Sequence, residues 1–128
     1  MLLGIKDSGF VHEIPDYNRL SVKQQIMEEL GTTSEDDLLY FVPRYITRAM
    51  NIPNIGMYGL RGVPEDPARA NHIASVLWAN ENKMVYGPVV IASCTEDGIK
   101  PLELMENSRI LDTVFMLQTC TKTIDFPM

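Results

Sequence analysis

The sequence predicts an α+β domain with a mostly antiparallel sheet of four to five strands and two to three helices packed on one face. The stretch from Ala70 to Cys94 is central to this prediction, because it joins a short amphipathic helix to the most strand-like run of the chain. The predicted elements follow the order β-β-α-β-β-α-β, with a further helix at the C-terminus. Two helices cannot connect five strands as parallel crossovers, so the sheet should be mostly antiparallel.

The length and composition are those of an ordinary globular protein. The chain has 128 residues, of which 45% are hydrophobic and 22% charged. We expect one domain over residues 1–118 and a tail over residues 119–128. No run approaches the roughly 18 consecutive apolar residues of a membrane span, and residues 1–7 lack the features of a signal peptide. These observations favour a cytoplasmic protein that does not enter a membrane.

The charge pattern argues against direct binding of nucleic acid. The formal net charge is −6 and the isoelectric point is near 4.8. Contact with phosphates needs clustered basic side chains, whereas the eleven basic residues are scattered singly. A local patch at Arg44, Arg48 and Arg61 is the alternative. We expect Cys94 and Cys120 to be free thiols, and no cofactor is predicted.

Two N-terminal elements have clear local signals. Residues 2–6 and 10–14 are β-prone runs separated by the turn sequence of residues 7–9, which predicts a hairpin. Residues 21–30 have a serine that can cap the first turn, a glutamine three positions later that can reciprocate, and apolar side chains at four-residue intervals. A glycine follows directly, so this segment should be a helix with a left-handed C-terminal residue.

The middle of the chain is less regular. Residues 32–37 are polar and acidic, which is more typical of a solvated loop than of a metal site. Residues 38–42 are most simply a strand, although the preceding acids could instead begin a helix through this run. Residues 44–53 fit either a helical turn or an irregular crossing. Residues 55–60 predict a strand whose two glycines indicate a bulge, a close approach of another backbone, or a ligand against the chain.

The second half of the chain continues the alternation. A helix after the connection of residues 62–69 has two candidate starts, Asp66-Pro67 and Asn71. Residues 83–94 predict a strand that is covered on both sides or central in its sheet, because both of its faces are apolar from Val85 onward. Pro88 should lie at a bulge or at the entry of this strand. A short return strand over residues 99–102 and a helix over residues 103–118 complete the pattern.

Three short motifs resemble a known family. They are Gly62-Val63-Pro64, the helix start Asn71-His72-Ile73-Ala74, and the strand Gly87-Pro88-Val89-Val90-Ile91. With these motifs the chain resembles, from about Leu2 to Leu117, the domain of unknown function 3846 family of phage, plasmid and large-virus genomes. His72 stands where that family often has a proline, and the segments 44–54 and 64–71 are longer here. The resemblance implies a small accessory protein of a mobile or viral genome and brings no catalytic residues.

The sequence shows no recognisable catalytic or metal-binding motif. The two histidines, His12 and His72, have no cysteine or acidic partner at metal-ligand spacing. No glycine-rich phosphate loop is present. Glu13 is the nearest candidate for acid–base work, and a solvent-facing strand position explains it better. We therefore predict no catalytic residues and no metal site.

One group of polar and aromatic residues lies at the ends of predicted elements, where side chains can line a ligand pocket. Its members are Tyr58, Arg61, Asn71, His72 and Tyr86. The simpler interpretation is structural: Asn71 caps a helix, the tyrosines pack with their hydroxyls at the surface, and Arg61 is solvated.

Two classes of function follow. The preferred hypothesis is a non-catalytic accessory protein of a phage or large virus that acts by contact with a host or viral protein. The alternative is a small-ligand or nucleotide-binding domain that uses the glycine-rich strand and the region of Tyr58, Arg61 and Tyr86. A capsid-associated structural role would fit the viral context without support from any residue.

Overall fold

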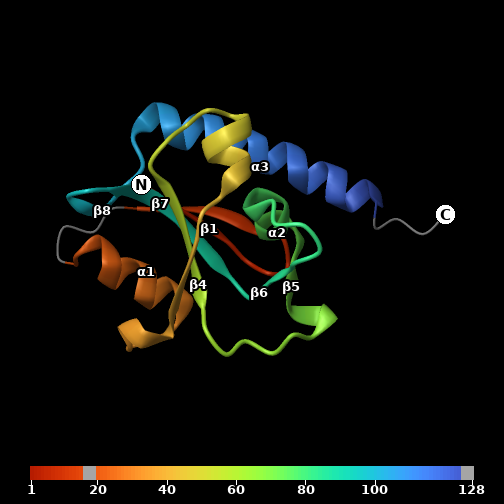
Figure 1. The fold of residues 1–128 in the computed structure, drawn as a ribbon, viewed down its shortest axis with the longest axis horizontal. Coiled ribbons are helices and arrows are strands. Elements are labelled where there is room, and N and C mark those ends of the chain that lie inside the picture. The colour runs from red at the N-terminus through yellow and green to blue at the C-terminus, as the bar shows by residue number, and fades with distance from the viewer. Residues whose placement is uncertain (16–19, 125–128) are drawn as a thin grey trace.

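The computed structural model describes residues 1–15 and 20–124 and shows a mixed α+β fold around one large antiparallel sheet (Figure 1). The sheet has six strands in the order β2-β1-β7-β4-β3, with β8 paired to β7, and β5 pairs with β6 in a small second sheet. The main-sheet strands are β1 (Leu2–Ile5), β2 (Val11–Ile14), β3 (Leu38–Phe41), β4 (Ile55–Leu60), β7 (Val89–Thr95) and β8 (Gly98–Lys100). The second sheet has β5 (Ala70–Asn71) and β6 (Val85–Tyr86), and the α-helices are α1 (Val22–Leu30), α2 (His72–Trp78) and α3 (Leu104–Ile124).

The predicted fold class is confirmed, since every strand pair is antiparallel. The sheet has six strands where four to five were expected. The helices also lie on both faces of the sheet, with α1 on one face and α2 and α3 on the other (Figure 1). The expectation of helices on one face therefore needs correction, and β7 gives the reason. Its side chains alternate between the faces and are apolar on each, so both faces need a cover.

The two faces have separate apolar cores. The larger core lies between the sheet and α2 and α3, and it includes Ile91 of β7, Leu77 of α2 and Ile110 of α3, each 0% exposed. The smaller core lies under α1 and includes Ile26 of that helix and Val90 of β7. Central strands that are buried on both faces account for the long apolar run in the sequence.

The predicted N-terminal hairpin and helix are confirmed. Strands β1 and β2 pair in register from Leu2 opposite Ile14 to Ile5 opposite Val11. Ser21 accepts a hydrogen bond from the Gln24 amide, and the Gln24 side chain accepts one from the Ser21 amide, so the predicted capping box is present. Gly31 has φ +82° and ends α1 in the left-handed conformation that suits glycine.

In the middle of the chain, the structure decides between the conformations that the sequence left open. Residues 38–41 form strand β3, and the acids before it form a single 3₁₀ turn, Glu35–Asp37. The segment 44–53 contains one π-helical turn, Tyr45–Ala49, whose Ile46 side chain is fully buried in the larger core. The strand glycines adjoin side chains: a Cβ on Gly56 would lie 2.8 Å from the Tyr40 ring.

Both candidate starts of the second helix are used, one after the other. Asp66 caps a short 3₁₀ turn, Pro67–Arg69, by accepting a hydrogen bond from the Ala68 amide at 3.0 Å. Asn71 then caps α2. The predicted strand over residues 83–94 is broken at Gly87 and Pro88, so that β6 lies before the break and β7 after it. Pro88 thus lies at the entry of β7, as expected for a residue that cannot donate to the sheet.

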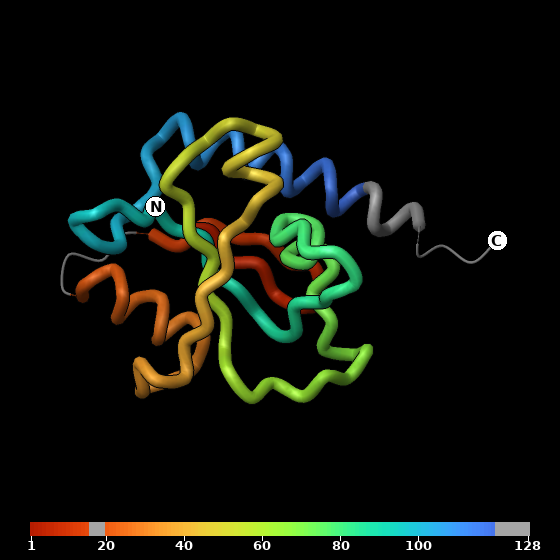
Figure 2. The backbone as a smooth tube through the Cα atoms, viewed as in Figure 1, coloured from red at the N-terminus to blue at the C-terminus, as the bar shows by residue number. Residues whose placement is uncertain are grey.

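The C-terminal helix is longer than predicted. Helix α3 begins at Leu104 and continues to Ile124, so residues 119–124 extend the helix beyond the expected domain end at residue 118. Residues 125–128 of the expected tail lie outside the described part of the chain. The backbone trace shows α3 passing across the sheet on the face opposite α1 (Figure 2). Within residues 1–15 and 20–124, no helix has both the length and the apolar character needed to cross a bilayer.

Candidate functional site

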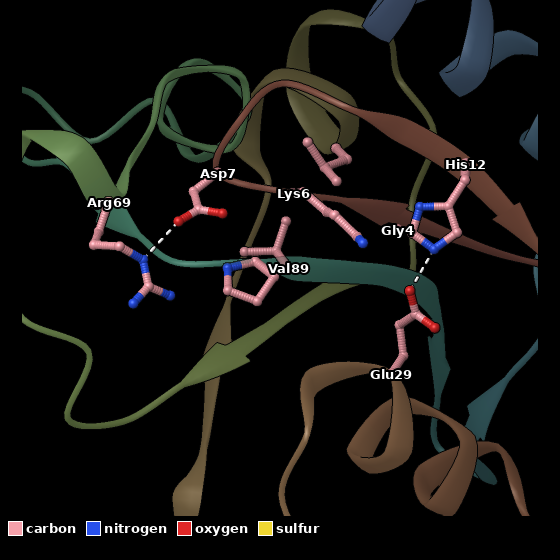
Figure 3. Close-up of a pocket in the computed structure, with 9 residues that line it drawn as sticks. Gly4, Lys6, Asp7, His12, Glu29, Arg69 and Val89 are labelled. Carbon is pink, nitrogen blue, oxygen red and sulfur yellow. Dashed lines mark hydrogen bonds and ion pairs between the residues drawn. The ribbon is translucent and has the colours of Figure 1, made fainter.

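A cavity of about 240 Å³ lies where the N-terminal hairpin, the end of α1 and the entry of β7 meet (Figure 3). Five of the residues that line it can carry charge, and we call this cavity the charged pocket. The charged pocket is lined by Gly4, Ile5, Lys6, Asp7, His12, Glu29, Arg69, Pro88 and Val89.

One side of the charged pocket is formed by an ion pair between Asp7 and Arg69. The Nε atom of Arg69 donates to Oδ2 of Asp7 at 2.7 Å, although the residues are 62 positions apart. The Arg69 backbone is also held, because its carbonyl accepts a hydrogen bond from the Gly87 amide at 2.8 Å. The pair engages Nε, and neither terminal guanidinium nitrogen has a hydrogen-bond partner among the described residues.

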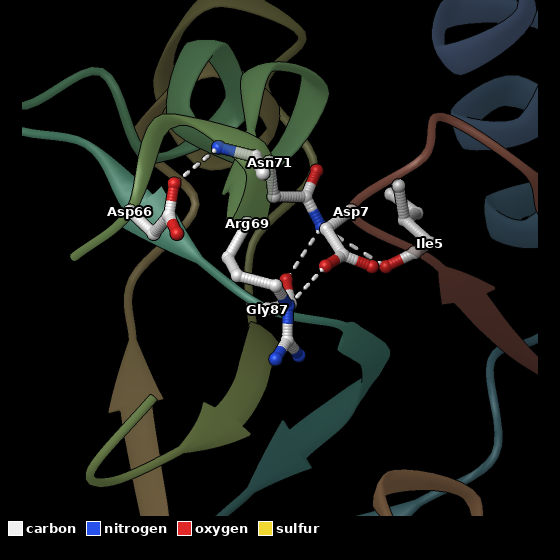
Figure 4. A network of polar contacts seen from close by, with 7 residues as sticks. Ile5, Asp7, Asp66, Arg69, Asn71 and Gly87 are labelled. Atoms are coloured by element: carbon white, nitrogen blue, oxygen red, sulfur yellow. Dashed lines mark hydrogen bonds and ion pairs between the residues drawn. The ribbon is translucent and has the colours of Figure 1, made fainter. Parts of the chain in front are cut away.

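Asn71 lies next to this side of the charged pocket and supports it (Figure 4). Its side chain is fully buried, and Nδ2 donates to the carbonyls of Ile5 at 3.0 Å and Gly87 at 2.9 Å. Its Oδ1 atom accepts from the Ala74 amide at 3.1 Å. One side chain therefore caps α2 and also joins the end of β1 to the entry of β7. A buried amide with its hydrogen bonds satisfied in this way gives a fixed geometry to the segments around it.

The other side of the charged pocket is formed by His12 and Glu29. Nε2 of His12 pairs with Oε1 of Glu29, which joins the hairpin to the last turn of α1 (Figure 3). The His12 ring lies over Gly4, where a Cβ would be 2.6 Å from the ring atom Cε1. Phe10 stacks on the ring with 5.6 Å between centroids. The Nδ1 atom is buried and has no hydrogen-bond partner among the described residues.

Lys6 lies between the two pairs in Figure 3. No carboxylate of the described residues forms an ion pair with its ammonium group, which lies 5.9 Å from the centre of the Phe10 ring. Asp7 and Glu29 are each already paired with a basic side chain. The cationic groups of the charged pocket that have donors without an anionic partner among the described residues are therefore the Lys6 ammonium group and the terminal nitrogens of Arg69.

The five residues predicted to bind a ligand do not line the charged pocket. Tyr86 lines a second cavity of about 210 Å³ beside Phe41 and Trp78, and the other four predicted residues do not line that cavity either. Arg61 donates two hydrogen bonds, from its amide to the Asp37 carbonyl at 2.6 Å and from its Nε to the Asp36 carbonyl at 3.1 Å. Arg61 therefore holds the turn before β3. His72 is exposed in the first turn of α2.

Tyr58 lies in the smaller core at 6% exposure, with its ring 5.4 Å from the Tyr40 ring. Burial raises the pKa of the Tyr58 phenol well above its ordinary value, and a hydrogen bond with the Cys94 thiol adds to this effect. Burial and the same thiol also raise the pKa of Tyr40. Both phenols stay neutral across the physiological range, so neither is suited to act as a base or a nucleophile there.

The residues of the charged pocket were not predicted as a site. His12 was examined as a possible metal ligand and interpreted as structural or surface-exposed, and Lys6, Asp7, Glu29 and Arg69 gave no signal by spacing. The partners in each ion pair lie 62 and 17 positions apart. The nearest indication was the turn sequence after β1, which places Lys6 and Asp7 at the end of a strand.

The comparisons with known proteins give no guide to this site. The chain matches no protein-family model, no curated protein and no solved structure. The resemblance to the domain of unknown function 3846 family therefore stays a prediction. Among the described residues, no group of three or more His, Cys, Asp or Glu side chains is placed to hold a metal ion.

Proposed function

We propose that this protein is a non-catalytic binding protein that holds a small anionic ligand in the charged pocket, through a phosphate or carboxylate group. The observation that carries the proposal is which charged groups of the pocket already have a partner of opposite charge. Both carboxylates are engaged in ion pairs, while the Lys6 ammonium group and the terminal nitrogens of Arg69 have no anionic partner among the described residues. Such donors bind an anion more strongly than a neutral acceptor.

The ion pair with Asp7 also orients one of these donors, the Arg69 guanidinium group. A guanidinium group held at Nε presents its two terminal nitrogens together, which matches two oxygens of a phosphate or carboxylate. The Asp7 contact at 2.7 Å holds Arg69 in this way. A lysine ammonium group acts as a point charge that adapts to the ligand. Arg69 would therefore set the orientation of the anionic group, and Lys6 would supply further charge.

The size of the charged pocket limits the ligand. Its volume of about 240 Å³ is slightly below the range of roughly 300–1,000 Å³ that is typical of sites for drug-sized ligands. A phosphate or carboxylate with a small attached group fits this volume. A larger nucleotide would place its anionic group inside and its base outside.

Thermal unfolding tests the proposal. The melting temperature is measured with inorganic phosphate, a nucleoside monophosphate and a small dicarboxylate, each against sodium chloride at equal ionic strength. A ligand at 100 times its dissociation constant stabilises the native state by about 2.7 kcal/mol, which corresponds to a rise of several degrees. We expect such a rise for at least one of the three anions.

Variants assign the effect to the charged pocket. Lys6→Gln and Arg69→Gln should each reduce the rise, whereas Lys83→Gln removes a lysine that does not line the pocket and should leave it unchanged. The proposal is wrong if none of the three anions raises the melting temperature. It is equally wrong if the Lys6 and Arg69 variants respond as the wild type does.

A second candidate function is contact with another protein, and the surface of α3 favours it. Four large apolar side chains on this helix are exposed: Leu104 at 84%, Met105 at 76%, Phe115 at 46% and Met116 at 55%. Exposed apolar side chains that gather on one element mark interaction surfaces. An accessory role in the cytoplasm of a cell infected by a phage or large virus, with a host or viral partner, belongs to this candidate. Loss of partner binding in Met105→Glu, with unchanged helical content, is its test.

A further inference from the structure

Four residues form a line along the outward side of α3. Met105, Arg109, Asp112 and Met116 are separated by four, three and four positions. This is the spacing at which side chains of a helix lie above one another on one side, and it is the spacing of the contact positions in a coiled coil. The buried residues Ile110 and Val114 lie on the opposite side of the helix. We call the four outward residues the α3 stripe.

The α3 stripe is open to a partner. Met105 is 76% exposed and Met116 is 55% exposed, and both charged residues between them are exposed as well. Arg109 donates one hydrogen bond, from Nη2 to the Met50 carbonyl at 3.0 Å. Neither Arg109 nor Asp112 forms an ion pair with any residue that the structure describes.

The order of residues in the α3 stripe is self-complementary. The two methionines are equidistant from the midpoint between Ile110 and Leu111, and so are the arginine and the aspartate. A second α3 that lies antiparallel about a two-fold axis through this midpoint would set Met105 against Met116 and Arg109 against Asp112. Because the axis repeats each contact, the pairing gives two methionine contacts and two opposite-charge contacts.

We propose that the α3 stripe is a self-association surface whose partner is the α3 stripe of a second copy of this chain, in antiparallel orientation. The charges select the orientation. A parallel pairing in register would place Arg109 against Arg109 and Asp112 against Asp112, and like charges in contact oppose association. The methionines are flexible enough to fill the two ends of the contact. None of the four residues lines the charged pocket, so this proposal does not rest on ligand binding.

Sedimentation equilibrium over a series of protein concentrations, from micromolar to about 1 mM, tests the proposal. The wild type should form a dimer in this range. Arg109→Asp and Asp112→Arg should each weaken the dimer about tenfold or more, because each converts both opposite-charge contacts into like-charge contacts. The double variant that carries both changes should restore the dimer, since the charges are then only exchanged.

Controls separate this effect from loss of folding. Glu81→Arg makes the same change of charge at an exposed position outside α3 and should leave the dimer intact. Asp112→Arg touches no hydrogen bond of the described side chains, whereas Arg109→Asp also removes the contact with Met50. Circular dichroism of each variant checks the fold. A wild type that stays monomeric up to 1 mM overturns the proposal, and so does a dimer that the exchange of charges does not restore.

Discussion

The two faces of the sheet differ in what their side chains do. The face under α2 and α3 is covered by the larger apolar core, which extends from β1 to the π-helical turn and α3. The face under α1 has a smaller core. Beside this core, at the end of α1, lie the His12–Glu29 pair and the charged pocket. The face under α2 and α3 therefore buries more apolar side chains, while the face under α1 leaves room for a ligand beside its smaller core.

Truncation of a core residue on each face should give the largest effects, and they should be unequal. Leu77→Ala removes a side chain that is 0% exposed beneath α3 and should cost about 4 kcal/mol. Leu30→Ala, at the 5% exposed end of α1, should cost about 2.5 kcal/mol, because its surroundings can close more easily. Urea unfolding measures both values, and an equal or larger cost for Leu30→Ala would remove the distinction between the faces.

Asn71 caps α2, which covers the larger core, and also holds the backbone beside the charged pocket. Its loss should therefore affect both the helix and the pocket. Asn71→Ala removes the cap of α2 and leaves the carbonyls of Ile5 and Gly87 without their donor. We expect a loss of about 3 kcal/mol in the free energy of unfolding. Asn71→Asp keeps an acceptor for the cap but sets a carboxylate against both carbonyls, and it should be less stable still. An aspartate variant as stable as the wild type would show that the two carbonyl contacts do not matter.

Substitution of Gly4 tests how the His12 ring packs beside the charged pocket. A methyl group there would lie 2.6 Å from the His12 ring, so Gly4→Ala should displace the ring, break its pair with Glu29 and cost about 2 kcal/mol. In a His12→Ala background the same change should cost less than about 0.5 kcal/mol, because the ring is gone. Equal costs in the two backgrounds would mean that the ring does not occupy this space.

Substitution of Tyr58 should have the smallest effect on the free energy of unfolding, and this effect should depend on pH. Its pKa is raised in the folded state by burial and by the Cys94 thiol, so its contribution to stability is fully present below pH 10 and is lost as pH rises further. Tyr58→Phe removes a titrating group from the smaller core. The variant should therefore lose about 1 kcal/mol less stability than the wild type between pH 9 and pH 11. Urea unfolding at several pH values in this range measures the difference, and parallel curves would contradict it.

Local signals in the sequence predicted the elements well. The Ser21 capping box and the left-handed Gly31 depend on neighbours within a few positions, so the bounds of α1 could be read directly. The apolar run after Val85 correctly indicated a strand covered on both sides. Helices cover both faces of this strand, whereas the prediction placed them on one face.

The candidate site could not be predicted in the same way. Arg69 meets Asp7, and His12 meets Glu29, only after the hairpin, the end of α1 and the entry of β7 have come together. Asn71 was correctly expected to cap a helix, but its two further contacts depend on carbonyls from distant strands. Arg61 directly follows β4, as predicted, but Tyr58 lies inside this strand and is buried in the smaller core, and neither residue lines the charged pocket.

Anion binding in the charged pocket is tested most directly by following backbone amide signals of isotope-labelled protein by NMR during titration with inorganic phosphate at constant ionic strength. We predict saturable shifts centred on Lys6, Asp7 and Arg69, which are lost in Lys6→Gln and kept in Lys83→Gln. Saturable shifts centred elsewhere, or no saturable shift at all, would contradict the account.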